Sequence, residues 1–316
     1  MGTNAILVTR SLPSAVIAKL REVGTVEVFT NGGMSPDLLR QRVADKDAVV
    51  TVLTDDINKS VIDAGTKLKI VANVAVGYNN IDVAYARSRG IVVTNTPDVL
   101  TESVADFTWA MILAITRRLS EGDRLIRRGG WRGWALDFML GTELKGKQLG
   151  LIGFGRIARA VAARAPAFGI RVVYSDVMSV DGPFERMTLD RLLNTSDVVS
   201  VHVPLTADTR HLIDRRALAK MKRSAYFINT SRGPVVDEAA VAWALKEHLI
   251  AGAALDVFEN EPAVHPDLLP LENVLLVPHL ASGTTETRTA MADLAVANVV
   301  AVLSGQMPVT PVPHSD

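Results

Sequence analysis

Three residues of the kinds that carry out acid–base chemistry each follow an apolar segment in the second half of the chain. Arg232 stands in NTSRG, Glu261 in DVFENEP and His279 in VPH. The planar guanidinium pairs with a carboxylate through two hydrogen bonds, and an imidazole, whose pKa lies near neutrality, donates a proton. A carboxylate on the far ring nitrogen raises the pKa of an imidazole and fixes its orientation. If a hydride donor binds nearby, this set suits reduction of a 2-keto acid.

Each of these residues also has an ordinary structural explanation. Arg232 could be a surface cation, Glu261 a turn acid and His279 a histidine satisfied within the core. Of the other histidines, His202 ends a strand and is expected to form part of a cofactor wall. The rest lie late in a helix, in loops and in the tail: His248, His211, His265 and His314. No histidine pair has metal-ligand spacing, so we expect no metal site.

A glycine fingerprint supplies the expected hydride donor. The segment GLIGFGRIA places Gly153, Gly155 and Ala158 in the pattern G-x-G-x-x-G/A, between an apolar strand and a helix predicted over residues 157–167. Gly153 permits the tight turn, Gly155 lets the backbone approach a pyrophosphate, and the helix N-terminus faces the phosphates. Such glycine-rich turns also arise by chance, so the fingerprint needs support from its surroundings.

Asp176 gives that support. It ends the next predicted strand, 23 residues after Gly153, where the fingerprint expects an acid that accepts hydrogen bonds from the adenosine ribose. Its ordinary explanation is a surface turn acid. A carboxylate there repels a 2′-phosphate, and Val177 follows instead of an arginine, so we predict NAD as the cofactor with NADP possible.

Parallel β-sheets must hold these residues. Short, continuously apolar strands alternate with amphipathic segments, which is typical of sheets covered on both faces. The first series has strands at 5–8, 26–29, 48–52, 70–72 and 91–94, with helical pieces such as 14–23 and 82–88. The second has strands at 148–152, 171–174, 198–201, 225–229, 252–256 and 274–277. One long helix, from a cap at Thr101 to about Arg128, separates the two series, and a last helix covers 284–303.

The composition excludes several classes of protein. The 316 residues are 48% apolar and 22% charged, and the formal net charge is zero, so a general nucleic-acid binder is not expected. A local basic stretch from Arg117 to Arg132 is interpreted as a solvated helix face. Without cysteine there is no disulfide, thiolate metal site or Cys nucleophile. No apolar run is long enough to span a membrane, and residues 5–8 are too short for a secretory signal, so we expect a cytoplasmic protein.

Taken together, the ordered motifs resemble the D-isomer-specific 2-hydroxyacid dehydrogenases over essentially the whole chain. The matching strings are VGYNNID (76–82), GFGRI (153–157), HVPLT (202–206), NTSRG (229–233), DVFENEP (256–262) and PH (278–279). The resemblance implies an α/β protein with two doubly wound parallel-sheet domains. A Rossmann-type cofactor domain would span 99–282, and a discontinuous, flavodoxin-like substrate domain would span 1–98 and 283–316.

The resemblance also implies roles for individual residues. Arg232, Glu261 and His279 would be catalytic, and the backbone amides of Val76 and Gly77 would hold the substrate carboxylate beside Arg232. The cofactor would be lined by Thr101, Gly153, Gly155, Arg156, Ile157, Asp176, His202, Val203, Pro204, Thr209, Thr230, Asp256 and Ser282. The usual assembly is a homodimer joined through the cofactor domains, including residues 101–140.

Within the family, the segment from Trp131 to Gly141 looks most like the glyoxylate/hydroxypyruvate reductase branch. Trp134 would then reach the other subunit's substrate pocket, although a dimer-packing aromatic is an equal alternative, and Leu53 would form an apolar wall. Asp55 and Asp56 stand where phosphoglycerate dehydrogenases place cations, which disfavours a phosphorylated substrate.

The chain departs from the family pattern at two positions, and two other functions are kept as alternatives. Ala281 replaces a frequent glycine, and Asp176 favours NAD where the reductase branch often uses NADPH. A non-catalytic NAD(H) sensor of the same fold is the alternative from another class, and a phosphite- or formate-oxidising enzyme is a weaker one. The carboxylate of Glu261 favours hydroxy-acid chemistry, because relatives that act on formate carry an amide there.

Overall fold

The computed structural model describes residues 4–313, which form two units. Unit 1 comprises residues 1–100 and 284–316, and unit 2 comprises residues 101–283. The boundaries expected from the sequence were 98/99 and 282/283. His314, predicted to lie in the tail, is outside the described residues.

Unit 1 is built on a five-stranded parallel sheet. Its strands are β1 (Asn4–Val8), β2 (Gly24–Val28), β3 (Ala48–Thr51), β4 (Ile70–Asn73) and β5 (Val92–Thr94). The spatial order β2-β1-β3-β4-β5 is that of flavodoxin-like folds. Because β3 and β4 are buried along their whole length, the sheet needs helices on both faces.

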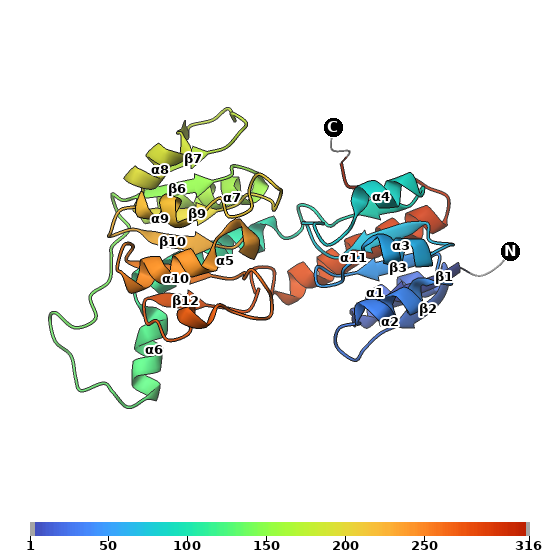
Figure 1. The fold of residues 1–316 in the computed structure, drawn as a ribbon, viewed down its shortest axis with the longest axis horizontal. Helices are drawn as coiled ribbons and strands as arrows, with labels where there is room; N and C mark the ends of the chain where they lie inside the picture. Colours follow the sequence, from blue (N-terminus) through green and yellow to red (C-terminus); the bar gives the residue numbers. More distant parts are fainter. Residues whose placement is uncertain (1–3, 314–316) are drawn as a thin grey trace. The chain divides into compact units, whose positions relative to one another are not determined.

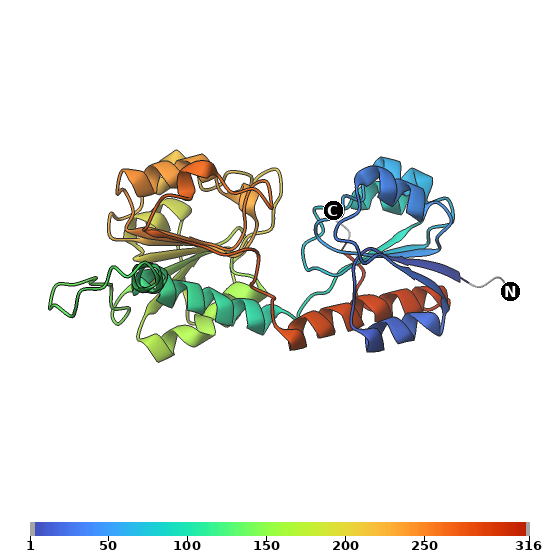
Figure 2. The same cartoon turned by 90° about the horizontal axis from the view of Figure 1, so that it is seen from below.

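Two helical layers cover that sheet (Figure 2). One face carries α1 (Ser14–Arg21) and α11 (Thr285–Leu303); the other carries α2 (Pro36–Val43), α3 (Lys59–Ala64) and α4 (Val83–Ser88). The last helix returns to the first strands because Ala292, Ala295, Val296 and Val299 are buried against the sheet. An ion pair of 2.7 Å between Lys19 and Asp293 joins α11 to α1.

Unit 2 contains a seven-stranded parallel sheet with the order β12-β11-β10-β9-β6-β7-β8 (Figure 1). Its strands are β6 (Gln148–Ile152), β7 (Arg171–Ser175), β8 (Glu185–Arg186), β9 (Val198–Val201), β10 (Tyr226–Asn229), β11 (Gly252–Leu255) and β12 (Val274–Leu276). One face packs on α5 (Thr101–Thr116) and α7 (Arg156–Arg164); the other packs on α8 (Leu189–Thr195), α9 (Arg215–Ala219) and α10 (Glu238–Lys246). Two parallel-sheet α/β units confirm the predicted fold class.

The single long helix predicted from Thr101 to Arg128 is wrong. The segment forms α5, in which Thr101 is the first helical residue and not its cap, and then α6 (Leu119–Arg127). The carbonyl of Thr116, which a continuous helix would bond to the amide of residue 120, accepts the amide of Thr142 at 2.8 Å. Arg118 then turns the chain with a φ of 54°.

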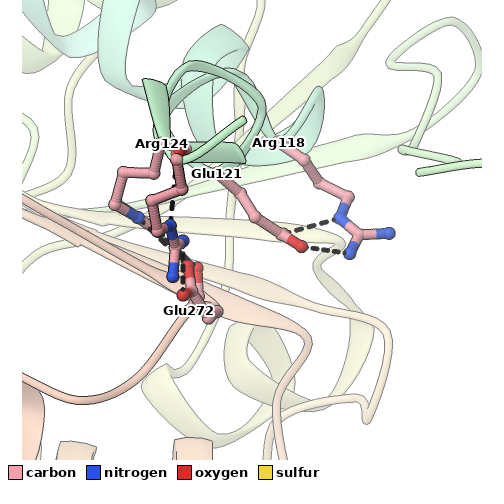
Figure 3. A network of polar contacts seen from close by, with 5 residues as sticks. Arg118, Glu121, Arg124 and Glu272 are labelled. Carbon is pink, nitrogen blue, oxygen red and sulfur yellow. Dashed lines mark hydrogen bonds and ion pairs between the residues drawn. The ribbon is translucent and has the colours of Figure 1, made fainter. Parts of the chain in front are cut away.

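The basic stretch around α6 forms ion pairs (Figure 3). Arg118, directly before α6, binds Glu121 of that helix at 2.6 Å, while Arg124 and Arg128 both bind Glu272, just before β12. The two guanidiniums, Arg128 first, hold the pKa of Glu272 below its usual value. Arg124 and Arg128 therefore connect α6 to the residue before β12.

Candidate active site

The glycine fingerprint forms the turn between β6 and α7. Gly153 has a φ of 84°, and a Cβ there would lie 2.8 Å from the carbonyl oxygen of His202, so no other residue fits without strain. A Cβ on Gly155 would meet nothing within 4 Å, so the backbone at the start of α7 is open on that side. The turn therefore has the two properties that a bound pyrophosphate needs, an open approach and a helix N-terminus.

Asp176 lies beside this turn, directly after β7. One oxygen of its carboxylate accepts the amide of Phe154 at 2.6 Å, and the other accepts the amide of Met178 at 2.9 Å. Arg186 donates to the carbonyl oxygens of Asp176 and Val177, which fixes the backbone after β7. These hydrogen bonds thus hold Asp176 against the glycine turn. Gly153, Gly155 and Asp176 together fit an adenine dinucleotide.

The other residues predicted to line the cofactor follow the strands at the carboxyl edge of the same sheet or begin the helices beside it. They are Thr101, Arg156, Ile157, His202, Val203, Pro204, Thr209, Thr230, Asp256 and Ser282. Thr209 donates to the carbonyl of Pro204 at 2.6 Å, and Thr230 contacts Thr108 of α5 at 3.1 Å. The carboxyl edge is where open α/β sheets bind ligands.

His202 is not suited to be the acid. Burial lowers its pKa to about 4, and its Nε2 lies 2.9 Å from the hydroxyl of Ser200. The ring is therefore neutral near pH 7, which agrees with the expected cofactor-wall role.

His279 and Glu261 form a pair at this edge. Nδ1 of His279 lies 2.9 Å from Oε2 and 3.2 Å from Oε1 of Glu261, so its Nε2 is directed away from the carboxylate. His279 follows β12 with a φ of 52°, a left-handed conformation that non-glycine residues adopt rarely. The strand and loop thus determine which ring nitrogen is available for proton transfer.

A buried carboxylate fixes the unusual backbone at His279. Asp256, which is 0% exposed, accepts the amides of Leu280 at 2.5 Å and Ala281 at 3.0 Å, and its carbonyl accepts the amide of His279 at 2.8 Å. Three consecutive amides are therefore bound by one residue at the end of β11. The resemblance suggested only a cofactor contact for Asp256, and this second role was not predicted.

Arg232 is brought near Glu261 by a close backbone approach. A Cβ on Gly233 would lie 1.8 Å from the carbonyl oxygen of Phe258, so only glycine allows the turn after β10 to contact the turn after β11. Asn229 holds the first turn by donating to the carbonyl of Arg232 at 3.1 Å, and Glu261 in the second accepts the amide of Phe258 at 3.1 Å.

Electrostatic interactions tie the three predicted catalytic residues together. Burial alone would raise the pKa of Glu261, but the hydrogen bond and charge of His279, with a smaller effect of Arg232, bring it below its usual value. Burial lowers the pKa of Arg232, and the charge of Glu261 opposes that change. Burial also raises the pKa of Asp256, against the effect of the amides that it binds. The Glu261 carboxylate is accordingly ionised at neutral pH.

Glu238 was not identified from the sequence. It is 5% exposed at the start of α10, and its carboxylate accepts the amides of Glu259 and of His265, the latter at 2.9 Å. Glu259 in turn binds His211 at 2.8 Å. Glu238 therefore holds both sides of the loop that carries Glu261. The available signal in the sequence was an acid in the first turn of a helix, but this is also the position of an ordinary helix-stabilising residue.

The residues predicted to contact substrate divide between the units. Leu53, Val76 and Gly77 lie in loops after β3 and β4 of unit 1. Asn80 links these loops by donating to the carbonyls of Val52 and Asp55. Trp134 lies in unit 2, in the loop after α6, and is 81% exposed.

The expectation from the sequence that Asp55 disfavours a phosphorylated substrate is wrong. Asp55 is 2% exposed and forms an ion pair of 3.1 Å with Arg10. Thr9 and Thr51 donate to the same carboxylate. Its charge is neutralised within the unit, so only Asp56 is left to support that argument.

Within residues 4–313, no group of three or more His, Cys, Asp or Glu side chains is arranged to hold a metal ion. The helices among the same residues are all too short or too polar to span a membrane.

The fold and the site define an oxidoreductase that uses a nicotinamide dinucleotide. A family model described as "D-isomer specific 2-hydroxyacid dehydrogenase, NAD binding domain" matches residues 109–281. A glyoxylate reductase of Thermofilum pendens is 48% identical over 98% of this chain and 94% of that enzyme. A crystal structure of a protein from Thermus thermophilus matches with a TM-score of 0.94 at 42% identity, covering 98% of this chain and all of that one.

A further structure is that of an NADPH-dependent glyoxylate/hydroxypyruvate reductase from Sinorhizobium meliloti in complex with NADP and malonate. Its TM-score is 0.90 at 38% identity, with 98% of this chain and 97% of that chain covered. This chain belongs to the D-isomer specific 2-hydroxyacid dehydrogenase family. The predicted family, reaction class and NAD(P) cofactor are confirmed, and the sensor alternative is not favoured.

Proposed function

We propose that the protein reduces glyoxylate, hydroxypyruvate or a similarly small 2-keto acid to the D-2-hydroxy acid. The observation that carries the proposal is the His279–Glu261 pair, at the edge of the sheet that also bears Arg232 and the glycine turn. The names of the relatives, which are glyoxylate reductases at 43–48% identity, support the choice of substrate class.

Each residue of the proposed catalytic set has one task. Arg232 binds the two oxygens of the substrate carboxylate through its planar fork of N–H donors, and its charge polarises the ketone. His279 donates a proton from Nε2 to the oxygen at C2, and the Glu261 carboxylate orients the ring by binding Nδ1. When bound, the reduced nicotinamide supplies the hydride. The amides of Val76 and Gly77 are proposed to bind the substrate carboxylate, and Leu53 and Trp134 to contact the substrate.

We propose NAD as the preferred cofactor, because the Asp176 carboxylate faces the fingerprint turn and its negative charge repels a 2′-phosphate. A steady-state assay of glyoxylate, hydroxypyruvate, pyruvate and a sugar keto acid with NADH and with NADPH tests both parts. Fastest turnover of glyoxylate or hydroxypyruvate with NADH is expected. Absence of turnover with every acid and both cofactors would refute the proposed function, and a preference for NADPH would refute the cofactor assignment alone.

Replacing Glu261 by glutamine tests the pair through its pH dependence. A carboxyl group with a lowered pKa loses its charge only as the pH falls through that lowered value, so the pair is intact at neutral pH and above. Glutamine has no charge to lose in this range, so the acid limb that Glu261 gives to keto-acid reduction should be absent from the variant, and kcat at neutral pH should fall by about 10-fold or more. The matched control is Glu259→Gln, which removes the carboxylate that binds His211 and should keep the acid limb; an equal change in both variants contradicts the assignment.

We also propose a homodimer formed by α6 and residues 128–143, which leave the sheet of unit 2 (Figure 1). No residue of α6 is buried, and Trp134, Leu136 and Leu140 are 81%, 82% and 66% exposed. A cavity of about 520 Å³ beside α6 is lined by apolar residues such as Leu140 and by charged residues such as Arg118 and Lys246, and it offers space for side chains of a second copy. Such clustered apolar exposure is typical of an interface.

Light scattering tests the dimer. The wild-type protein should have twice the chain mass of 34.0 kDa, and the double variant Leu136→Asp/Leu140→Asp should have the mass of one chain, because buried unpaired carboxylates oppose association. Met307→Asp, at an 85% exposed site in unit 1, is the control for an added surface charge. A monomeric wild-type protein rules the dimer out.

The cytoplasm remains the proposed location, in keeping with a chain that contains no cysteine.

A further inference from the structure

Three consecutive peptide carbonyls after β4 are anchored inside unit 1. The carbonyl of Ala75 accepts the amide of Thr96 at 2.9 Å. Nδ2 of Asn95 donates to the carbonyl of Val76 at 2.7 Å, and Nδ2 of Asn73 donates to the carbonyl of Gly77 at 2.9 Å. Two of the three anchors are therefore side chains, and both are carboxamides.

These anchors determine where the neighbouring N–H groups point. In a trans peptide the N–H is directed opposite to the C=O of the same unit. The three anchored units carry the N–H groups of Val76, Gly77 and Tyr78, which are thus turned away from the anchoring residues. Between residues 4 and 313, no protein acceptor binds any of these three N–H groups. Successive free amides of this kind form a concave site for an anion.

The two asparagines are held more firmly than a surface turn requires. Asn73 is 0% exposed, and its Nδ2 also donates to Asn80 at 3.2 Å. Its Oδ1 is buried and accepts no hydrogen bond from the described residues, so the carboxamide is held through Nδ2.

Asn95 is 7% exposed, and it is fixed from the end of the chain. The hydroxyl of Thr310 donates to the backbone carbonyl of Asn95 at 2.6 Å, and the backbone carbonyl of Thr310 accepts the backbone amide of Asn95 at 3.3 Å. Asn298 of α11, which is fully buried, binds both the amide and the hydroxyl of Thr310. The Asn95 side chain that donates to the carbonyl of Val76 is therefore held in place by two other segments of the chain.

We propose that Asn73 and Asn95 are positioning residues for the substrate carboxylate, and that the Tyr78 amide joins those of Val76 and Gly77 as a donor to it. The inference rests on the proposed function, which assigns Val76 and Gly77 to that carboxylate. It identifies the side chains that create the carboxylate site, and it adds one amide to that site. Asn73 and Asn95 act through the backbone and do not contact the reacting atoms.

The test uses kinetics of the full-length enzyme. Asn73 and Asn95 are each replaced by leucine, which keeps the branched arrangement of heavy atoms, and by alanine, which reduces the volume; both remove the donor. Because the amides hold the carboxylate in the ground state and the transition state alike, KM for glyoxylate should rise about 10-fold or more while kcat changes by about threefold at most. The dissociation constant of oxamate with enzyme and NADH should rise in parallel, and that of NADH alone should not change.

Asn4→Ala and Asn4→Leu are the matched controls. Nδ2 of Asn4 donates to the carbonyl of Val23 at 2.9 Å in the same unit, at the opposite edge of the sheet. Unchanged KM and oxamate affinity in the Asn73 and Asn95 variants overturn the inference. A fall in Tm beyond that of the controls, together with loss of NADH binding, also overturns it, because a structural role then explains the loss. A wild-type enzyme that reduces no keto acid refutes the proposed function instead.

Discussion

Replacement of His279 by alanine is expected to lower kcat for keto-acid reduction by about 10²- to 10⁴-fold, the usual contribution of a positioned general acid. The loss should be confined to chemistry, because the ring contacts Glu261 while the backbone is held separately by Asp256. NADH should therefore bind with unchanged affinity in a fluorescence titration.

His211→Ala is the matched control for this experiment. His211 also binds a glutamate, Glu259, at 2.8 Å and also has a positive φ, of 50°. It lies in the same unit but is not assigned to the site. Wild-type turnover in the His279 variant, or an equal loss in the His211 variant, would show that the wrong histidine was chosen.

Replacement of Arg232 by alanine should reduce kcat/KM for keto acids by about 10²- to 10⁴-fold. A hydrogen bond to a charged group contributes about 1.5–3 kcal/mol, and the guanidinium is expected to make two of them. Lysine should recover little of this loss, because a single ammonium group cannot reproduce the planar fork.

The control for Arg232 is Arg171→Ala, which removes an exposed arginine that binds Glu185 in the same unit. Its kinetics should match the wild type. If Arg232→Ala also loses NADH binding or its folded structure, the deficit reflects misfolding, and the assignment of Arg232 to the carboxylate loses its support.

Residue type and position after a strand were sufficient to predict much of the site. Arg232, Glu261 and His279 each follow a strand of one parallel sheet, and such a sheet gathers its carboxyl ends at one edge. The glycine turn and Asp176 were predictable for the same reason, since their spacing is set by one strand–helix–strand unit.

Contacts between distant segments were not predictable. The break between α5 and α6 depends on Thr142 binding Thr116, and helical periodicity continues through that point. Asp55 seemed free to repel a phosphate, but Arg10 lies 45 positions earlier in the sequence and neutralises it.

The anchoring residues were missed for a related reason. Glu238, Asn73 and Asn95 are polar residues at the ends of elements, where capping or solvation is the usual explanation. Only the structure shows that their side chains bind the backbone of the loops after β4 and β11.

A crystal structure of the protein with NADH and oxamate tests the central claim most directly. The proposal predicts that Arg232 binds the oxamate carboxylate through two nitrogens and that Nε2 of His279 lies within hydrogen-bond distance of the oxygen at the reacting carbon. Glu261 should remain on Nδ1. Oxamate bound away from Arg232, with His279 in contact with neither ligand, would contradict it.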